Sequence, residues 1–309
     1  MITYLTHNQI DIQRWDECIS NSPNGNVYAW SWYLDVVHPN WDALIEDDYE
    51  SVMPLTGNRK FGISYLFQPF FTQQLGIFSK NKTDKNKVRK FIDAIPDRFK
   101  FAEIRLNSGN IFFDNCQNIE YHRNTELNLS SDYDSLRKNY NSNTKRDLAK
   151  AETANLKNSD DVETAEIVNL FRENRGKRIK HWGDTEYERF LNLADVARSK
   201  GHCFVKGVKN TDNELVAGAV FMTSHDRIVF LFSGADESNK ELHALSFLID
   251  NVIKENSGTP KIFDFEGSDN DGLARYYKGF GGQEVKYPSL RFNKTQGSVK
   301  FLLKIFKGK

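Results

Sequence analysis

The chain has 309 residues, a length that accommodates about two domains. It carries 42 Lys and Arg side chains against 42 Asp and Glu, so no overall positive field would collect nucleic acid. Cys18, Cys116 and Cys203 lie far apart and lack the spacing of a zinc site or of a disulfide framework. The first residues show no signal-peptide pattern, and there is no run of about 18 apolar residues. We therefore expect a cytoplasmic protein without a metal and without a DNA partner.

The first half of the sequence predicts two helices, a series of strands, a third helix and a further strand. The helices are expected where apolar residues recur at helical intervals, over 9–19, 28–37 and 87–95. The strands are expected over 41–46, 49–55, 63–78 and 101–106, with turns at 47–48 and 57–59. We place the end of the first lobe near residue 129.

The second half predicts the same order of elements again. Helices are expected over 133–156, which is polar and basic, and over 165–177, 185–199, 244–255 and 273–278. Strands are expected over 203–208, 215–223, 228–232, 261–265 and 284–291. Asp93 aligns with Asp250, 157 residues later, each just before a strand. A repeat this long indicates a duplicated domain rather than a solenoid.

The order of helix pair, three-strand meander, helix, strand, short helix and strand is that of the GNAT N-acetyltransferase fold. The chain resembles more specifically the FemAB family of bacterial peptidyltransferases, which add amino acids from aminoacyl-tRNA to the peptide of peptidoglycan precursors. The stretches that carry the resemblance are 28–32, 141–151, 214–221, 230–236, 263–267 and 276–282. The chain lacks the long charged heptad insertion that some members use as a tRNA-facing arm.

The resemblance implies an α/β protein with mixed sheets, built from two tandem GNAT-like (acyl-CoA N-acyltransferase) domains. We expect an N-terminal domain over 1–129 and a C-terminal domain over 130–309 that ends in a helix. The implied activity is transfer of an aminoacyl or acyl group onto an amine of a cell-envelope (peptidoglycan) precursor. Aminoacyl-tRNA or acyl-CoA would be the co-substrate, and a muropeptide or a small molecule would be the acceptor, with no bound cofactor.

Acyl transfer to an amine requires a base for the amine and a polarised acyl carbonyl, held in attack geometry. In the GNAT arrangement a bulge exposes backbone N–H groups to the carbonyl, and we predict it at Ser233 and Gly234. The alternative is that Gly234 simply begins a loop. Asp264 and Glu266 would share one face of a regular strand. We predict Glu266 as the catalytic base and Asp264 as a structural acid paired with Arg275 or Lys278.

Substrate-binding residues are expected in the basic segment 172–181, since arginine binds phosphate and carboxylate groups through a bidentate fork. The resemblance implies a substrate-contacting arginine there, Arg175 or Arg178, and the alternative is a solvated helix face. The rest of the predicted substrate-binding set is Trp182, Tyr28, Trp30 and Lys278.

A second basic row on the helix over 133–156 includes Lys145 and Arg146, for which a tRNA or phosphate contact is one interpretation and a solvated face the favoured one. The tail 298–309 alternates apolar and lysine residues. It is interpreted as a docked terminal helix, or alternatively as a peripheral contact with the inner membrane surface.

The stretch 237–244 contains no glycine and two carboxylates, where users of coenzyme A have a glycine-rich turn for the pyrophosphate. This composition disfavours coenzyme A as a ligand of the second lobe. Two alternatives to the FemAB-like transferase stay open: an acyl-CoA-dependent N-acyltransferase, and a non-catalytic module that binds a glycan or a phosphate ligand.

Overall fold

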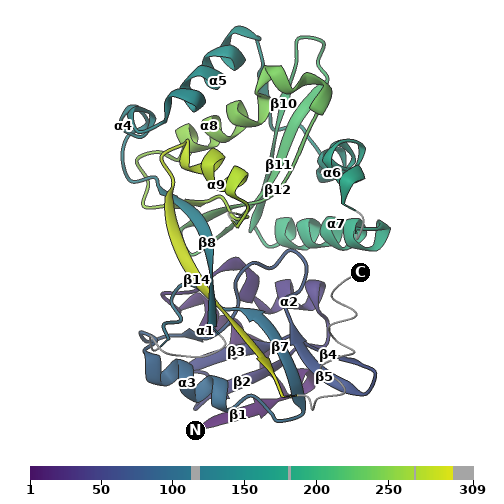
Figure 1. The fold of residues 1–309 in the computed structure, drawn as a ribbon, viewed down its shortest axis with the longest axis vertical. Helices are drawn as coiled ribbons and strands as arrows, with labels where there is room; N and C mark the ends of the chain where they lie inside the picture. The colour runs from purple at the N-terminus through teal and green to yellow at the C-terminus, as the bar shows by residue number, and fades with distance from the viewer. Residues whose placement is uncertain (113–118, 180–181, 268, 295–309) are drawn as a thin grey trace. The chain divides into compact units, whose positions relative to one another are not determined.

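The computed structural model describes residues 1–112, 119–179, 182–267 and 269–294. Cys116, Lys180, His181 and the predicted tail helix lie outside these ranges. The chain forms two compact units (Figure 1): unit 1 is Met1–His122 with the chain from Lys286 onwards, and unit 2 is Arg123–Val285. The sequence-based boundary was placed at 129, and it did not anticipate that the chain returns to unit 1 after Val285. Strands β8 (Ile119–Asn128) and β14 (Gln283–Asn293) each pass from one unit to the other.

Unit 1 begins with a strand and two helices and continues with strands around a third helix. Its elements are β1 (Ile2–Leu5), η1 (His7–Gln9), α1 (Ile12–Ser20), η2 (Val27–Ala29), α2 (Ser31–Val37), β2 (Asp42–Glu46), β3 (Ser51–Leu55), β4 (Gly57–Lys60), β5 (Ile63–Phe67), β6 (Phe78–Ser79), α3 (Lys85–Asp93) and β7 (Phe99–Arg105). Strands pair in the orders β1-β2-β3-β6 and β4-β5-β7-β14. The β5–β7 pair is parallel, and β14 runs antiparallel to β7.

Side-chain caps and apolar stripes account for the helices of unit 1. Asp11 accepts a hydrogen bond from the backbone N–H of Arg14 at the start of α1, and Asp84 accepts one from Lys87 at the start of α3. Helix α1 then buries Trp15, which packs against Trp41 with ring centroids 4.5 Å apart. The stripe of each helix therefore faces the core of its own unit.

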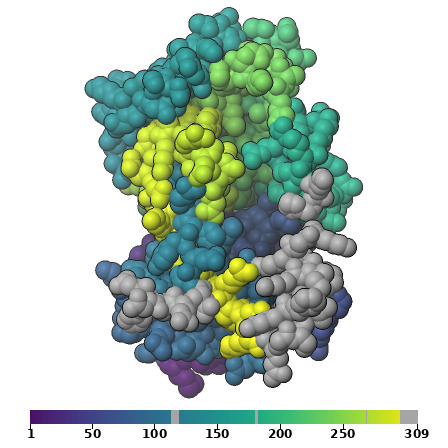
Figure 2. Space-filling model, viewed as in Figure 1, coloured from purple at the N-terminus to yellow at the C-terminus, as the bar shows by residue number. Residues whose placement is uncertain are grey.

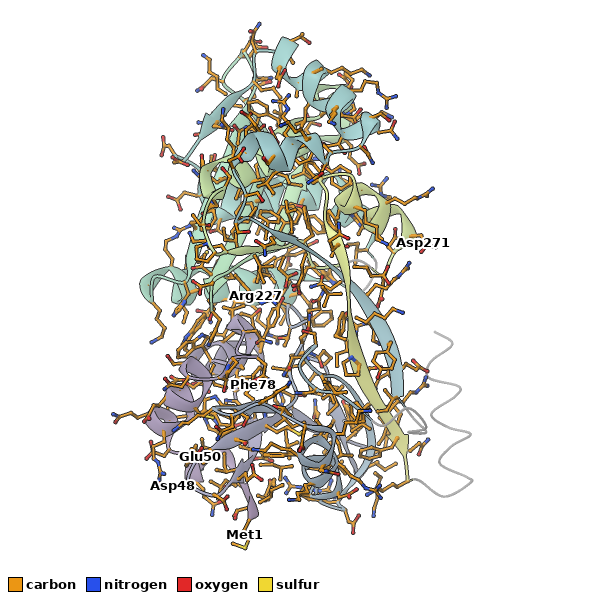
Figure 3. The ribbon with its side chains drawn as sticks, turned by 90° about the vertical axis from the view of Figure 1, so that its left-hand side faces the viewer. Met1, Asp48, Glu50, Phe78, Arg227 and Asp271 are labelled. Atoms are coloured by element: carbon orange, nitrogen blue, oxygen red, sulfur yellow. The ribbon has the colours of Figure 1, made fainter. Side chains whose placement is uncertain are left out.

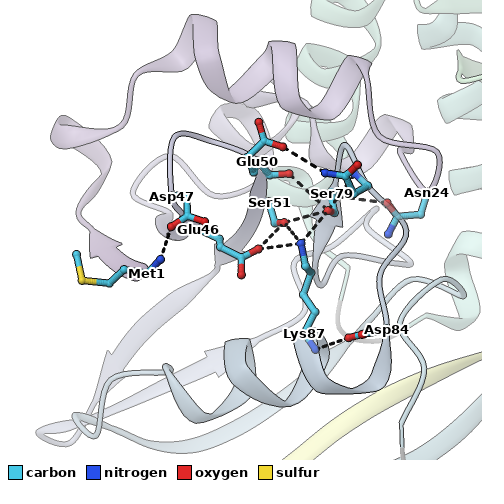
Figure 4. Close-up of polar contacts among 10 residues, drawn as sticks. Met1, Asn24, Glu46, Asp47, Glu50, Ser51, Ser79, Asp84 and Lys87 are labelled. Carbon is cyan, nitrogen blue, oxygen red and sulfur yellow. Dashed lines mark hydrogen bonds and ion pairs between the residues drawn. The ribbon is translucent and has the colours of Figure 1, made fainter.

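A polar cluster joins α3 to strands β2, β3 and β6 (Figure 4). Lys87 Nζ lies 2.8 Å from Glu46 Oε2 and donates a hydrogen bond of 2.8 Å to Ser51 Oγ. The hydroxyls of Ser51 and Ser79 lie 2.9 Å apart. Burial alone would raise the pKa of Glu46, but the hydrogen bonds from Lys87 and Ser51 bring it below its ordinary value. The cluster is thus a satisfied ionic network that holds four elements together.

Unit 2 repeats the alternation of helices and strands. Its elements are α4 (Tyr133–Lys138), α5 (Ser142–Thr153), β9 (Lys157–Ser159), α6 (Thr164–Glu173), η3 (Arg175–Arg178), α7 (Asp184–Ser199), β10 (Cys203–Lys209), β11 (Leu215–Ser224), β12 (Arg227–Ala235), η4 (Glu237–Leu242), α8 (Ala244–Asn256), β13 (Ile262–Asp264) and α9 (Asp271–Lys278). The strand order is β8-β13-β12-β11-β10-β9, with β12 and β13 parallel and the other neighbours antiparallel.

Helices cover both faces of the unit 2 sheet. Helix α6 packs on β11 and β12, while α8 packs on β10 and β11 from the other face with α5 against it (Figure 1). The core on the α8 side is aromatic and includes Phe221, Phe263 and Leu248, all at most 1% exposed. None of the helices in the described ranges has both the length and the apolar character needed to cross a bilayer.

The predicted mixed α/β architecture is confirmed, and the local differences have identifiable causes. The expected helix over 133–156 is two helices, because Asn141 caps a new one by accepting a hydrogen bond of 2.8 Å from Thr144 N. The expected turn at 57–59 is strand β4, and the turn lies instead at Phe61 and Gly62, whose φ angles are 50° and 78°. The extended segment expected over 63–78 is interrupted between β5 and β6.

Candidate active site

The central strands of unit 2 separate at one end. Strands β12 and β13 pair only between Arg227–Val229 and Ile262–Asp264. Beyond Val229, no strand within the described residues pairs with β12 on its β13 side. The β11–β12 register also shifts, because Val220 faces Phe232 while Phe221 faces Phe230, so Leu231 is a bulge. A bulge bends its strand and turns backbone groups out of the ladder. The carboxyl ends of two parallel strands therefore flank an open backbone edge, a common ligand position in α/β sheets.

Glu266 stands at the mouth of this gap, directly after β13. Its φ of 55° and that of Gly267, 57°, are in the left-handed region, so the strand ends at Asp264 and the expected alternation of carboxylates is broken. Asp264 is 4% exposed and accepts a hydrogen bond of 3.0 Å from Glu266 N. Asp264 is a structural acid as predicted, but its cationic partner is Arg227, at 3.5 Å, rather than Arg275 or Lys278.

Tyr277 of helix α9 brings Glu266 and Arg175 into one electrostatic neighbourhood. Burial raises the pKa of Tyr277, the neighbouring Tyr276 and the Glu266 carboxylate raise it further, and Arg175 lowers it. The ring stacks on Phe265 with centroids 4.9 Å apart, which fixes its direction. Tyr277 therefore stays protonated near neutral pH and is available as a hydrogen-bond donor. Sequence reasoning quoted this tyrosine only as part of the family resemblance.

The two candidate arginines of η3 have different surroundings. Arg178 forms an ion pair with Glu237 of η4, whose backbone N–H also donates 2.9 Å to Asn174 Oδ1. No ion pair of Arg175 occurs within the described residues, and its side chain is exposed. Gly176 lies so close to α6 that a Cβ there would stand 2.9 Å from Phe171 O. Close packing thus sets the position of η3, and Arg175 is the arginine free to meet a ligand.

Aromatic side chains line the η3 side of β12. Trp182 is half-buried and stacks on Phe232 with centroids 6.3 Å apart and an interplanar angle of 18°. Phe232 also packs on Phe171 and Phe190, at 4.8 Å and 4.4 Å. The structure therefore places the predicted Trp182 beside the end of β12.

Ser233 and Gly234 lie inside β12, opposite Ala219 and Gly218. The bulge is at Leu231, so neither residue is the bulged one, and Gly234 does not begin a loop. A Cβ on Gly234 would stand 2.5 Å from Ile167 O of α6. The glycine is therefore required for close contact between helix and strand.

Five predicted residues have other surroundings. In unit 1, Tyr28 is 2% exposed and contacts Tyr33 edge-on, while Trp30 caps α2. In unit 2, Lys278 pairs with Glu284 at 2.9 Å on the surface of α9, whose yellow-green residues are visible in Figure 2. Arg146 lies 3.4 Å from Asp147, and Lys145 donates a hydrogen bond of 2.9 Å to the carbonyl oxygen of Lys138. Tyr28 is thus a core residue of unit 1.

The N-terminus of α8 is the place where a coenzyme A pyrophosphate would be bound in a GNAT domain. His243, with a φ of 50°, precedes the helix, and its Nδ1 lies 3.7 Å from Asp147 Oδ2 of α5. Asp236 and Glu237 lie just before it in η4 and its cap. Carboxylates near a helix N-terminus offset the positive potential of the helix dipole, which would otherwise attract a pyrophosphate.

A cavity of about 620 Å³ lies at the opposite end of the strands, by the start of α6 and the ends of α7 and α8. Two of its cations are already in ion pairs: Lys206 lies 2.8 Å from Asp160 and 2.9 Å from Glu255, and Arg198 lies 3.3 Å from Glu163. The third, Lys261, donates a hydrogen bond of 3.0 Å to Asn256 Oδ1. We therefore place the candidate site at the gap between β12 and β13. Within the ranges that the structure describes, no three His, Cys, Asp or Glu side chains are grouped to hold a metal ion.

Comparisons with known proteins agree with this architecture. Residues 135–278 match the model of the acetyltransferase (GNAT) domain. A search of curated proteins found no significant match. The crystal structure of FemX is similar with a TM-score of 0.69 and 11% identity, over 95% of this chain and 98% of that chain. L-PGS from Bacillus licheniformis has a TM-score of 0.58 and 8% identity, over 96% of each chain.

A conserved protein of unknown function from Bacteroides thetaiotaomicron also has a TM-score of 0.58, at 12% identity, over 94% of this chain and 99% of that chain. The FemX-like fold spans nearly the whole chain, and the GNAT match lies in its second half. The predicted tandem GNAT-like fold and the resemblance to FemAB proteins are thereby confirmed at the level of fold. The chain has a FemX-like fold with a GNAT domain match in its second half.

Proposed function

We propose that the chain is a FemAB-type transferase that moves an aminoacyl group onto an amine at the gap between β12 and β13. The observation that supports this most directly is the open backbone edge of β12, with Glu266 just after the neighbouring strand β13 and Tyr277 stacked on Phe265. A base and a hydrogen-bond donor thus accompany the open edge, and the charge of Arg175 lowers the pKa of Tyr277. The FemX-like fold supports the same reaction class.

Each group has a role in the proposed reaction. Glu266 accepts a proton from the attacking amine, whose nitrogen forms a bond to the acyl carbon. Backbone N–H groups of β12 near the Leu231 bulge stabilise the oxyanion of the tetrahedral intermediate. The carbon–oxygen bond to the donor then breaks, and Tyr277 hydrogen-bonds to the leaving oxygen, which takes up the proton released through Glu266. The amide product and the free hydroxyl of the donor balance the reaction.

Arg175 binds the acidic group of the acceptor in this proposal. A guanidinium without an ion pair among the described residues can form a bidentate contact with a phosphate or a carboxylate. Trp182 and Phe232 provide an apolar wall beside it. A peptidoglycan precursor fits both features, since a UDP-linked muropeptide has phosphates, carboxylates and an acceptor amine.

Aminoacyl-tRNA is the proposed donor, with Lys145 and Arg146 on the exposed side of α5 as candidate contacts for its phosphates. The stretch 237–244 before α8 contains no glycine and is preceded by Asp236, and both features disfavour a coenzyme A pyrophosphate. This donor is present in the cytoplasm, so the proposal places the protein there. The donor is a co-substrate, and the scheme uses no bound cofactor.

The second candidate is an acyl-CoA-dependent N-acyltransferase, favoured by the GNAT domain match over 135–278. Calorimetry with acetyl-CoA separates the two candidates. Binding of acetyl-CoA together with acetylation of an amine would replace the aminoacyl-tRNA donor, and absence of binding would leave aminoacyl-tRNA as the donor.

The test of the proposed function is a transfer assay with UDP-linked muropentapeptide and a mixture of charged tRNAs, read by the mass of the acceptor. We expect the acceptor to gain the mass of one aminoacyl residue. Arg175→Ala should raise KM for the acceptor about 10-fold or more, since charged hydrogen bonds contribute about 1.5–3 kcal/mol. Lys177→Ala, an exposed cation of the same η3, is the matched control and should leave KM unchanged. Equal effects of both substitutions would remove Arg175 from the site.

A further inference from the structure

Asp264 is a buried carboxylate that contacts the turn presenting Glu266. Its Oδ1 accepts two hydrogen bonds, one of 3.0 Å from Glu266 N and one of 2.8 Å from Asn124 Nδ2 of β8. Asn124 is fully buried, so its amide could not form a hydrogen bond to water if the bond to Asp264 were lost. The carboxylate therefore couples the last residue of β13 to the conformation of the residue two positions later.

One arginine serves two carboxylates at this place. Arg227, at the start of β12 (Figure 3), lies 3.5 Å from Asp264 Oδ2 and 2.9 Å from Glu126 Oε1. The side chains of Asp264 and Glu126 are only 6% and 11% exposed. Two ionised carboxylates would leave one negative charge uncompensated in the interior. The proton that relieves this excess can reside on Asp264.

The turn that follows needs a strong acceptor. Glu266 is held in the left-handed region, at a φ of 55°, where a residue with a side chain is strained. An ionised carboxylate is a stronger acceptor for a backbone N–H than a protonated one. Ionisation of Asp264 thus favours the turn, and protonation weakens the bond that maintains it.

We propose that Asp264 is a positioning residue that holds the Glu266 turn in place only while its carboxylate is ionised, so that proton binding at Asp264 regulates the proposed site. The inference rests on the proposed role of Glu266 for its effect on transfer, but the coupling between residues 264 and 266 is a property of the fold alone.

The carboxyl of Asp264 ionises close to neutral pH. Burial raises the pKa of Asp264 to about 6, Arg227 opposes this, and Glu126 adds to it. Asn124 and the Glu266 N–H lower it through their hydrogen bonds. Among the described residues, these groups act on Asp264 from β12, from β8 and from the turn. Asp264 is therefore ionised at neutral pH and becomes protonated on modest acidification.

The test is an NMR titration of the full chain from about pH 4.5 to about pH 8, around the usual range of a perturbed carboxyl. The Glu266→Gln background is used so that the side chain of residue 266 does not itself titrate. We expect the amide of residue 266 and the Asp264 carboxyl carbon to change with one common midpoint near 6. An amide that does not follow the carboxyl carbon would overturn the proposal.

Two further substitutions in that background sharpen the result. Asp264→Asn should abolish the titration of the residue 266 amide. Glu126→Gln is the matched control, because it removes a carboxylate from the same arginine without touching the turn. It should lower the common midpoint by about one unit or less and keep the amide titration. If Asp264→Asn does not fold, Glu126→Gln still decides the assignment: a lowered midpoint assigns the titration to Asp264, and loss of the titration would assign it to Glu126.

Transfer assays separate the inference from the proposed function. Asp264→Asn should lower kcat about 10-fold with KM little changed, and should remove the part of the acidic limb that has its midpoint near 6. Unchanged transfer in Asp264→Asn, when the coupling is present in the Glu266→Gln protein, would overturn the regulation while leaving the proposed function standing. Unchanged transfer in Glu266→Gln with the coupling intact would refute the role of Glu266 instead.

Discussion

The two units differ at one corresponding position of their sheets, where two parallel strands diverge. In unit 2 the second half of β12 has no strand beside it on the β13 side in the described residues. In unit 1 the corresponding place beside β7 is filled by Leu75, which forms a parallel bridge with Leu106. Leu75 N donates 2.9 Å to Arg105 O, and Asn107 N donates 2.7 Å to Leu75 O. The same architecture is thus open at one site and closed at the other.

The segment that closes the edge in unit 1 stands where unit 2 has its bulge. Strands β3 and β4 of unit 1 together correspond to β11, and their turn at Phe61 and Gly62 corresponds to the turn at His225 and Asp226, all four with positive φ. Strands β5 and β6 then correspond to the two halves of β12. Where unit 2 has the single bulged residue Leu231, unit 1 has the segment 68–77. The comparison teaches that the length of chain at the bulge decides whether the backbone edge is available.

The largest effect is expected on the rate of transfer, from a substitution in the open site of unit 2. Glu266→Gln should lower kcat by about 10²–10⁴-fold, the usual contribution of a general base. The free energy of unfolding should change little, since Glu266 is only half-buried. Transfer kinetics and urea unfolding of the same preparation check this, and a loss of stability as large as the loss of rate would count against a catalytic role.

Leu106, which bridges Leu75 at the closed edge of unit 1, should behave in the opposite way. It is fully buried, so Leu106→Ala should lower the free energy of unfolding by about 2–5 kcal/mol. The kcat of the folded fraction should stay that of the wild type. A chemical unfolding curve with a transfer assay below the transition measures both, and a kcat loss at full folding would make unit 1 part of the chemistry.

Asp264→Asn should stabilise unit 2 at neutral pH, because it removes the excess buried negative charge and leaves Arg227 paired with Glu126. The folded pKa of Asp264, about 6, lies above its unfolded value, so the folded state binds more protons between the two. The free energy of unfolding therefore falls as pH rises toward 6 and is level above it. Denaturation at a series of pH values should show the stabilisation fading on acidification, and destabilisation at neutral pH would contradict it.

Lys87→Ala should destabilise unit 1 by about 2 kcal/mol, because Glu46 would lose its cation while 15% exposed. The lowered folded pKa of Glu46 gives stability that is present above its unfolded pKa and lost as pH falls through the folded one. The variant should therefore lose less stability in acid than the wild type. Lys90→Ala, an exposed lysine of the same helix, is the control, and an equal effect there would show that the ion pair is not responsible.

The smallest effect is expected at Lys278, which sequence reasoning placed in the substrate-binding set. Its ion pair with Glu284 is largely exposed, so Lys278→Ala should change the free energy of unfolding by about 0–1 kcal/mol. The KM for the acceptor should not change. A clear rise in KM in the transfer assay would return this lysine to the site.

Local patterns in the sequence determined most of the elements. The helix over 244–255 and the strand over 215–223 follow from apolar periodicity, and the start of α3 follows from Asp84 as its cap. These signals lie within one turn or one strand, so they do not depend on the rest of the chain. Strands β1 and β8 gave weaker patterns and were not predicted.

Tertiary structure alone decided the composition of the candidate site. Arg175, Glu266 and Tyr277 lie on different elements, and the charges of Arg175 and Glu266 reach Tyr277 only because the fold of unit 2 brings η3, the end of β13 and α9 together. The choice between Arg175 and Arg178 depended on Glu237, because Glu237 forms an ion pair with Arg178 and not with Arg175. The return of β14 to β7 was likewise set by pairing between distant strands. Contacts between residues so distant in sequence leave no local periodicity from which they could be predicted.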